Sequence, residues 1–188
     1  MLEIKIPEFT AKLRHNDGAH IFYLSEEKEA YIKNALVFIL DGIRNEDYVL
    51  MIENPRLTPL ICQQLEQLVT EEELKTVRFA NNFEFYWRQG DFLPESIIQY
   101  FKNTLKAASL EGRSFRTWGH IEWGNQGDFE EKILTYDNNA NKFVTENKFI
   151  AVCAYDSPRV SEQLQTQLRA RHNYLMEDDR INVIPVSW

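Results

Sequence analysis

The chain alternates short apolar runs with longer segments whose apolar residues recur at helical spacing. Runs of about five β-branched or aromatic residues predict strands, and apolar residues three and four positions apart predict amphipathic helices. The predicted strands are His20–Leu24, Tyr48–Ile52, Val77–Ala80, Ser114–Trp123, Phe149–Tyr155 and Ile181–Val186. The predicted helices run from Ser25 to Asp41, from Thr58 onward, from Pro94 to Leu110, from Phe129 to Thr145 and from Ser161 to Leu175. This alternation is typical of βαβ units, so we expect an α/β domain with a mostly parallel central sheet flanked by helices.

Local signals refine the ends of these elements. Ser25 is a predicted N-cap, and Gly42 is a predicted helix stop. A polar run at 137–142 is expected to interrupt the helix that contains it, because Asn and Asp favour turns over helix interiors. We find no internal repeat and no low-complexity linker, so residues 1–188 are expected to form a single domain.

Composition narrows the class of protein. Of the 188 residues, 44% are apolar, which predicts a packed domain, and the net charge of −8 disfavours both nucleic acid and anionic membranes as partners. The segment Met1–Phe9 lacks the basic and apolar regions of a signal peptide, so a cytoplasmic location is expected. Cys62 and Cys153 lie far apart without a metal-binding spacing and are expected to be free thiols.

The ends of the predicted strands are the first place to seek a ligand site. In a mostly parallel sheet, ligands bind outside the carboxyl ends of the strands. The candidate segments are Tyr23–Glu26, Glu53–Asn54, Trp123–Asn125 and Tyr155–Asp156. Each of them also fits an ordinary strand-to-helix turn.

The first of these turns argues against nucleotide chemistry. The segment Leu24–Lys28 contains no glycine, and neither a Gly-x-x-x-x-Gly-Lys nor a Gly-x-Gly-x-x-Gly motif occurs in the chain. Glu26 and Glu27 would repel a triphosphate at the start of the helix. We therefore expect neither nucleotide hydrolysis nor a bound cofactor.

Other chemical candidates have equally good structural explanations. The side chains of His15, Asp17 and His20 could bind a metal, but the Asn-Asp-Gly sequence between them is typical of a loop that enters a strand. His120 and Glu122 face the same side of a strand and could form an acid/base pair, although cross-strand hydrogen bonding explains them as well. We predict neither catalytic residues nor a metal site.

A nucleophile and base could also be drawn from two residues near the end of the chain. Cys153 and His172 are of the right types for such a pair. Burial in the middle of a strand, however, is expected to leave the Cys153 thiol inert.

Aromatic residues gather at or near the predicted strand ends. Their flat apolar rings and polar edges suit a pocket for a small organic molecule, although core packing also explains each of them. They are Tyr23, Trp87, Trp118, Trp123 and Tyr155.

The order of several short motifs resembles the MEDS family, a sensory domain named for methanogen and methylotroph proteins and a dichloromethane-responsive regulator. The matching positions are Gly18–Tyr23, then Arg116, Gly119 and Trp123, then Tyr136, Asp137 and Asn141, then Cys153–Asp156, and finally His172. The chain departs from the family pattern in four ways: His20 and Tyr23 are closer together than is usual, His120 and Asp137 each stand where glutamate is usual, and Asn173 replaces a proline.

The resemblance implies a RecA- or KaiC-like three-layer core without a working Walker A loop. It also implies a regulatory role in sensing small hydrocarbon-like ligands. Family members are often fused to a histidine kinase or a DNA-binding domain. For this chain we expect signalling through a separate protein, such as a kinase or transcription regulator, or through a homodimer.

We therefore interpret the chain as a sensory domain that binds a small organic molecule, a signalling partner or both. The residues expected to contact the ligand are Tyr23, Arg116, His120, Trp123, Tyr155, Asp156 and His172. Two alternatives stay open: a degenerate ATPase-like interaction scaffold, and a small hydrolase or transferase that uses His120, Glu122 or Asp156.

Overall fold

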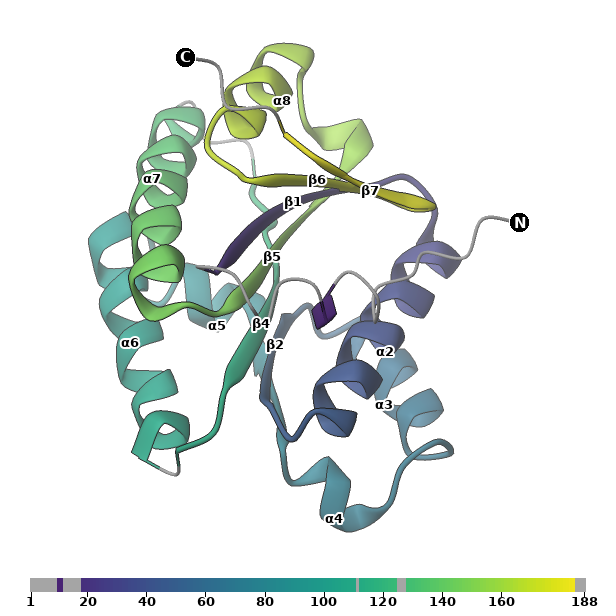
Figure 1. Ribbon diagram of the computed structural model, residues 1–188. Coiled ribbons are helices and arrows are strands. Elements are labelled where there is room, and N and C mark those ends of the chain that lie inside the picture. Colours follow the sequence, from purple (N-terminus) through teal and green to yellow (C-terminus); the bar gives the residue numbers. More distant parts are fainter. Residues whose placement is uncertain (1–9, 12–17, 111, 125–127, 185–188) are drawn as a thin grey trace.

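A seven-stranded sheet organises the computed structural model, which describes residues 10–11, 18–110, 112–124 and 128–184 (Figure 1). The spatial order of the strands is β3-β2-β4-β5-β1-β6-β7, and all neighbours are parallel except β6 and β7. Their bounds are β1 (Ala19–Ser25), β2 (Tyr48–Glu53), β3 (Val77–Asn81), β4 (Phe115–His120), β5 (Ile150–Asp156), β6 (Tyr174–Glu177) and β7 (Arg180–Val183). The predicted α/β class and mostly parallel sheet are confirmed.

Helices cover both faces of this sheet and complete the expected three layers (Figure 1). One face carries α2 (Lys28–Arg44), α3 (Thr58–Leu65) and α4 (Glu71–Leu74). The other carries α5 (Asn82–Tyr86), α6 (Pro94–Leu110), α7 (Phe129–Asn147) and α8 (Glu162–Arg169), with the short 3-10 helix η1 (Ser157–Arg159) after β5.

The sheet separates two hydrophobic cores, because successive side chains of a strand point to opposite faces. In β5, Cys153 and Tyr155 belong to the core beneath α6 and α7, whereas Val152 and Ala154 belong to the core beneath α2. Burying one large apolar side chain contributes roughly 1.5–3 kcal/mol. Both faces of the central strands are therefore apolar, which explains their nearly continuous hydrophobic runs.

The ends of α2 differ from the prediction. Ser25 is the last residue of β1, so it does not cap the helix, which begins at Lys28 after the N-cap residue Glu27. Gly42 lies inside the helix instead of ending it. A Cβ atom at Gly42 would lie 2.5 Å from Val49 Cγ2, so this glycine allows α2 to approach β2 closely.

Four other differences concern helices and strand ends elsewhere in the chain. Helix α7 continues through its polar run, because Asp137 and Ala140 point into the core while Asn138 faces solvent. Helix α8 ends at Arg169. Residues 170–173 form a turn, and Tyr174 and Leu175, also predicted to be helical, begin β6, which pairs with β7 as an antiparallel hairpin. The short helices α4 and α5 were not predicted, and β4 ends at His120 instead of Trp123.

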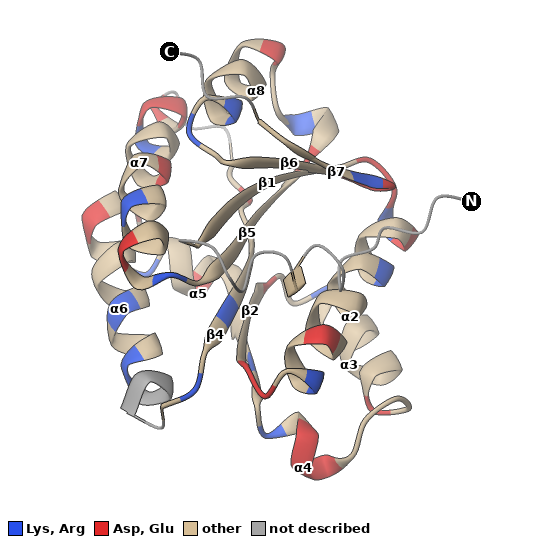
Figure 2. Ribbon diagram, viewed as in Figure 1, with Lys and Arg blue, Asp and Glu red and all other residues tan. Residues whose placement is uncertain are grey.

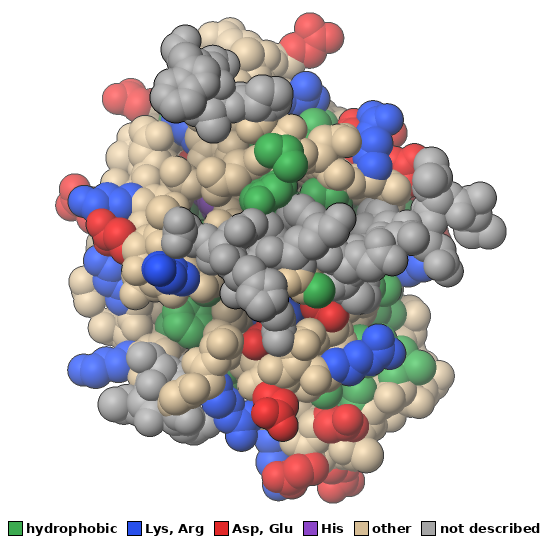
Figure 3. Space-filling view, viewed as in Figure 1, with side chains coloured by type: hydrophobic (Ala, Val, Ile, Leu, Met, Phe, Trp, Pro, Cys, Tyr) green, Lys and Arg blue, Asp and Glu red, His purple; other side chains and the backbone are tan. Residues whose placement is uncertain are grey.

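Charged residues are spread over most elements, with a local acidic group on α4 (Figure 2). On the face shown in Figure 3, hydrophobic side chains form small separate areas between polar ones. No described helix is long and apolar enough to cross a membrane. Both cysteines are free, Cys153 buried and Cys62 half-buried. The candidates His15, Asp17 and Asn125 lie outside the described residues.

Candidate functional site

Polar side chains converge where the three central strands β2, β4 and β5 end. His120 closes β4, and its Nδ1 atom lies 2.6 Å from Glu53 Oε1 at the end of β2. Its Nε2 atom lies 3.2 Å from Asp156 Oδ1 at the end of β5. With Asn54 and Glu122, these residues form what we call the strand-end cluster.

Apart from Asp156, whose side chain is 39% exposed, the strand-end cluster is buried, so its charges need partners within the protein. Glu53 is fully buried and accepts hydrogen bonds from Tyr31 Oη at 2.5 Å and from its neighbour's backbone at 2.7 Å. Tyr31 in turn accepts a hydrogen bond from Trp118 Nε1 at 2.8 Å. A chain of hydrogen bonds therefore runs from Asp156 through His120 into the core beneath α2.

Glu122 gives the cluster its second buried carboxylate. It accepts hydrogen bonds from Asn54 Nδ2 at 3.0 Å and Asn82 Nδ2 at 2.9 Å. It also pairs at 2.9 Å with a guanidinium nitrogen of Arg56, whose side chain is 77% exposed. This carboxylate thus joins the start of α5 to the loop that follows β2.

The environment of His120 fixes its charge. Burial alone would lower the pKa of His120, but hydrogen bonds and charges from Asp156 and Glu53 outweigh it and raise the pKa to about 10. The imidazolium in turn lowers the pKa of Asp156. A general base must be unprotonated at its working pH. His120 is cationic at neutral pH and therefore serves poorly as a base.

The same cluster includes potential metal ligands. His120, Glu122 and Asp156 each offer one ligand atom within 4.8 Å of the others. A cation there would have to displace the proton that His120 holds between two carboxylates. The geometry thus favours a proton over a metal ion at neutral pH.

The structure brings together some of the residues predicted to bind ligand. His120 and Asp156 belong to the strand-end cluster. The partly buried Trp123 follows β4, stacks on Phe129 with ring centroids 4.5 Å apart, and lies beneath the guanidinium of Arg159. This edge of the sheet is therefore the one indicated by the sequence.

The other four predicted residues lie elsewhere. Tyr155 and His172 are buried on the α7 side of the sheet. Tyr23 is buried beneath α2. Arg116 lies near the amino end of β4, at the opposite edge, where it pairs with Asp47 at 2.5 Å and with Asp41 at 2.7 Å. Neighbouring protein groups surround each of these side chains.

The turn between β1 and α2 is already occupied by a carboxylate of the chain itself. Asp178, in the β6–β7 hairpin, accepts hydrogen bonds from the backbone nitrogens of Glu26 and Glu27 at 3.1 and 2.8 Å. It also accepts one from Tyr23 Oη at 2.6 Å. Nucleotide-binding α/β proteins hold phosphate at such a helix N-terminus. Here Asp178 uses the same backbone donors.

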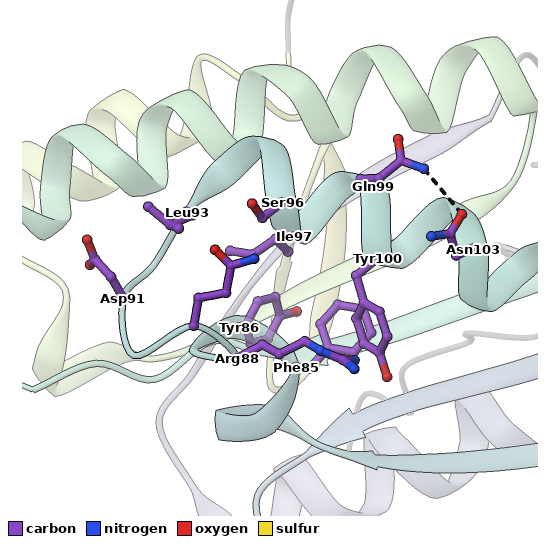
Figure 4. A pocket seen from close by; sticks show the side chains of 11 residues that line it. Phe85, Tyr86, Arg88, Asp91, Leu93, Ser96, Ile97, Gln99, Tyr100 and Asn103 are labelled. Atoms are coloured by element: carbon purple, nitrogen blue, oxygen red, sulfur yellow. Dashed lines mark hydrogen bonds between the residues drawn. The ribbon is translucent and has the colours of Figure 1, made fainter.

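A cavity of about 360 Å³ opens between α5 and α6 rather than at the strand-end cluster (Figure 4). Aromatic and aliphatic side chains form part of its wall, and polar groups surround them. The lining residues are Phe85, Tyr86, Arg88, Gln89, Asp91, Leu93, Ser96, Ile97, Gln99, Tyr100 and Asn103. None of the seven predicted ligand residues is among them. In the sequence, the dense run of aromatic residues at 83–87 could have indicated this cavity.

Helix α5 links this cavity to the strand-end cluster. At its start, Asn82 donates to His120 O at 3.0 Å and to Glu122 Oε2 at 2.9 Å. At its end, Phe85 and Tyr86 line the cavity, and Trp87 Nε1 donates to Glu122 O at 3.1 Å. The two sites therefore share one short element.

Comparisons with known proteins agree with this architecture. The model of the family described as "MEthanogen/methylotroph, DcmR Sensory domain" matches residues 19–173. A KaiC-like protein from Pyrococcus horikoshii has a similar structure, with a TM-score of 0.57, 11% identity, and coverage of 85% of this chain and 70% of that one. The flagellar accessory protein FlaH from Methanocaldococcus jannaschii gives a TM-score of 0.54, 11% identity, and coverage of 94% and 78%. No curated protein sequence matched. At these identities the structural likeness establishes a KaiC- or RecA-like fold alone.

Proposed function

Because the chain belongs to the MEDS family of sensory domains, we propose that it senses a small organic molecule bound in the cavity between α5 and α6. In this proposal the strand-end cluster responds to the bound molecule. The observation that carries the proposal is a ligand-sized cavity whose wall includes the same helix that supplies Asn82 to the cluster.

The size and lining of the cavity support a small organic ligand. Binding cavities for such molecules span about 300–1,000 Å³ and combine apolar walls with a few polar groups. Tyr86 and Ile97 supply buried apolar surface, while Arg88 lies with its guanidinium carbon 4.4 Å from the centre of the Tyr100 ring. We therefore propose a molecule with an aromatic or aliphatic body and one hydrogen-bond acceptor such as a carboxylate.

The packing of α5 supports a coupled response. Tyr86 is buried against Gly119 of β4, so a shift of this ring would be felt at the strand that ends in His120. A ligand changes a conformational population only when it binds one state better than another. Asp156, with a side chain 39% exposed, and Arg56 would present the resulting change at the surface to a partner protein or a second copy.

Two features weigh against the alternative of a hydrolase or transferase. The raised pKa of His120 leaves the imidazole protonated at neutral pH, so His120 itself serves poorly as the general base of such a mechanism. Asp178 occupies the backbone donors that would otherwise suit a phosphate. We accordingly propose that His120, Asp156 and Trp123, at the carboxyl ends of the strands, respond to the bound molecule. The cytoplasmic location stays a prediction.

Thermal unfolding with benzoate, phenol and indole as probes tests the proposal. Ser96 is exposed and lines the cavity, so Ser96→Trp would fill it without disturbing the core. Asn138→Trp, on the exposed side of α7, is the matched control. We expect at least one probe to raise the Tm of the wild type and the control but not that of Ser96→Trp. No increase with any probe, or an equal increase in Ser96→Trp, would contradict the proposal.

A further inference from the structure

A second group of chemically active side chains lies on the opposite side of the sheet from the strand-end cluster. His20 comes from β1, Cys153 from β5, Asp137 from α7, and His172 from the segment after α8. All four are at least 95% buried, and each offers one ligand atom within 4.8 Å of the other three. We call this group the His-Asp-Cys-His cluster.

Backbone carbonyls set the orientation of both imidazoles. His172 Nδ1 lies 2.8 Å from Leu168 O, and His20 Nδ1 lies 3.4 Å from Arg171 O. A carbonyl oxygen only accepts, so each Nδ1 carries the proton and each Nε2 carries a lone pair. Such carbonyl contacts are the usual means of fixing a metal-binding histidine.

Both Nε2 atoms point toward the other two members of the cluster. His20 Nε2 lies 3.3 Å from Cys153 Sγ, and His172 Nε2 lies 3.8 Å from Asp137 Oδ1. Tyr155 Oη lies 3.2 Å from Asp137 Oδ2 and 3.5 Å from Oδ1, so the same carboxylate contacts both Tyr155 and His172. The four ligand atoms thus lie within 4.8 Å of one another, with the two imidazole rings stacked at a centroid distance of 3.9 Å.

His172 Nε2 lacks a hydrogen-bond partner within the described part of the chain, although it is completely buried. Leaving a buried polar atom unpaired destabilises the folded state. A ligand at the centre of the cluster would satisfy this lone pair, which the protein itself does not.

The set of ligand types identifies the class of ion. Two imidazoles, one thiolate and one carboxylate are ligands that Zn²⁺ accepts, and four protein ligands are typical of a closed structural site. Zinc–ligand bonds of about 2.0–2.3 Å place tetrahedral ligand atoms roughly 3.3–3.8 Å apart. The two separations of 3.3 and 3.8 Å lie in this range, and the remaining ligand atoms, within 4.8 Å of one another, would have to move closer when the ion binds.

We propose that His20, Asp137, Cys153 and His172 form a structural zinc site. It would tie α7 and the segment after α8 to β1 and β5, with the thiolate and carboxylate balancing the charge of the ion. The site is independent of the ligand cavity, since it shares no residue with it.

The protonation states of the four side chains without metal follow from their burial. Burial lowers the pKa of His20 and lowers that of His172 to about 4, so both imidazoles are neutral and ready to bind. Burial also raises the pKa of Asp137 to about 8 and that of Cys153 further above its usual value. Zinc binding would then release protons from the carboxyl and the thiol, and its affinity would rise with pH.

Metal analysis of the purified protein tests the site. We expect about one zinc ion per chain, a lower Tm after removal by a chelator, and recovery of the Tm on adding Zn²⁺. Substitution with Co²⁺ would produce the absorption band of a cobalt–thiolate bond. Less than a tenth of an equivalent of zinc, together with a Tm that Zn²⁺ does not raise, would overturn the proposal.

Variants assign the metal to its ligands. Cys153→Ser should abolish the cobalt–thiolate band and weaken zinc binding at least about tenfold, whereas Cys62→Ser should leave both unchanged. His120→Gln separates this site from the strand-end cluster and should also leave zinc binding unchanged. If Cys153→Ser does not fold, the cobalt–thiolate band is compared between the wild type and Cys62→Ser. A band that is the same in both comes from Cys153, because Cys62 and Cys153 are the two cysteines of the chain. A band that survives in Cys153→Ser, or zinc binding lost only in His120→Gln, would refute the assignment.

Discussion

His120 shows how a single residue can hold a permanent charge inside this protein. Its residue type marks it in the sequence, whereas Asp156 is marked both by its type and by its place directly after a predicted strand. Its charge state could not be read from the sequence, because it depends on Glu53, which is 67 residues away in the chain and 2.6 Å away in space. The structure therefore changes the interpretation of His120 from an acid/base candidate to a buried cation.

This charge makes a predictable contribution to stability. The pKa of His120 rises from 6.5 in the unfolded chain to about 10 in the folded one, so its contribution is complete below pH 6.5 and is lost as the pH rises through 10. We expect His120→Gln to lower the free energy of unfolding most near pH 6.5 and progressively less toward pH 10. Urea unfolding of both proteins across this range measures the difference. A difference that grows with pH would contradict the proposed charge state.

At the scale of elements, the long helices and central strands could be predicted because their hydrophobic patterns are strong. Helix α5 could not, since five residues hold too little periodicity and its aromatic run also fits a strand. The start of α2 was misplaced because the group bound at its amino end comes from Asp178, in a hairpin about 150 residues later. Tertiary contacts therefore determine both the formation of α5 and the residue at which α2 begins.

The packing of α5 on β4 can be tested at Gly119. A Cβ atom there would overlap Tyr86 Oη, which is buried, so the ring would have to shift to make room. We expect Gly119→Ala to lower the free energy of unfolding by about 1–3 kcal/mol, as overpacking does. Adding Tyr86→Phe removes the overlapping oxygen and should recover much of the loss. Gly124→Ala, which meets no neighbouring atom within 4 Å, is the control. Chemical denaturation that finds no recovery in the double variant would count against this contact.

The carboxylate of Asp178 can be tested in the same way. It accepts hydrogen bonds at the amino end of α2, where negative charge is also favoured by the helix dipole. We expect Asp178→Ala to lower the free energy of unfolding by about 0.5–2 kcal/mol, the usual cost of losing such a cap. Asp179→Ala, at the exposed neighbouring position, should change it far less. Equal effects of the two substitutions would show that Asp178 does not stabilise the helix.

At the scale of the whole molecule, the order of motifs was enough to indicate the family and the layered α/β fold. It could not reveal the His-Asp-Cys-His cluster, whose members are separated by up to 152 residues, from 20 to 172, and meet only because β1 and β5 are neighbours. It also could not reveal the cavity, whose shape depends on how α5 and α6 pack. Sites made of side chains from distant elements need the three-dimensional arrangement.

The central claim is that ligand binding in the cavity changes the strand-end cluster through a movement of α5. Titration followed by two-dimensional NMR, using the probe that raises the Tm most, tests it directly. We predict shifts of the amide signals of residues that line the cavity, accompanied by shifts of the Asn82 side-chain amide and the His120 ring N–H signals. Shifts at the cavity with Asn82 and His120 unchanged, or shifts confined to regions outside the cavity, would contradict the account.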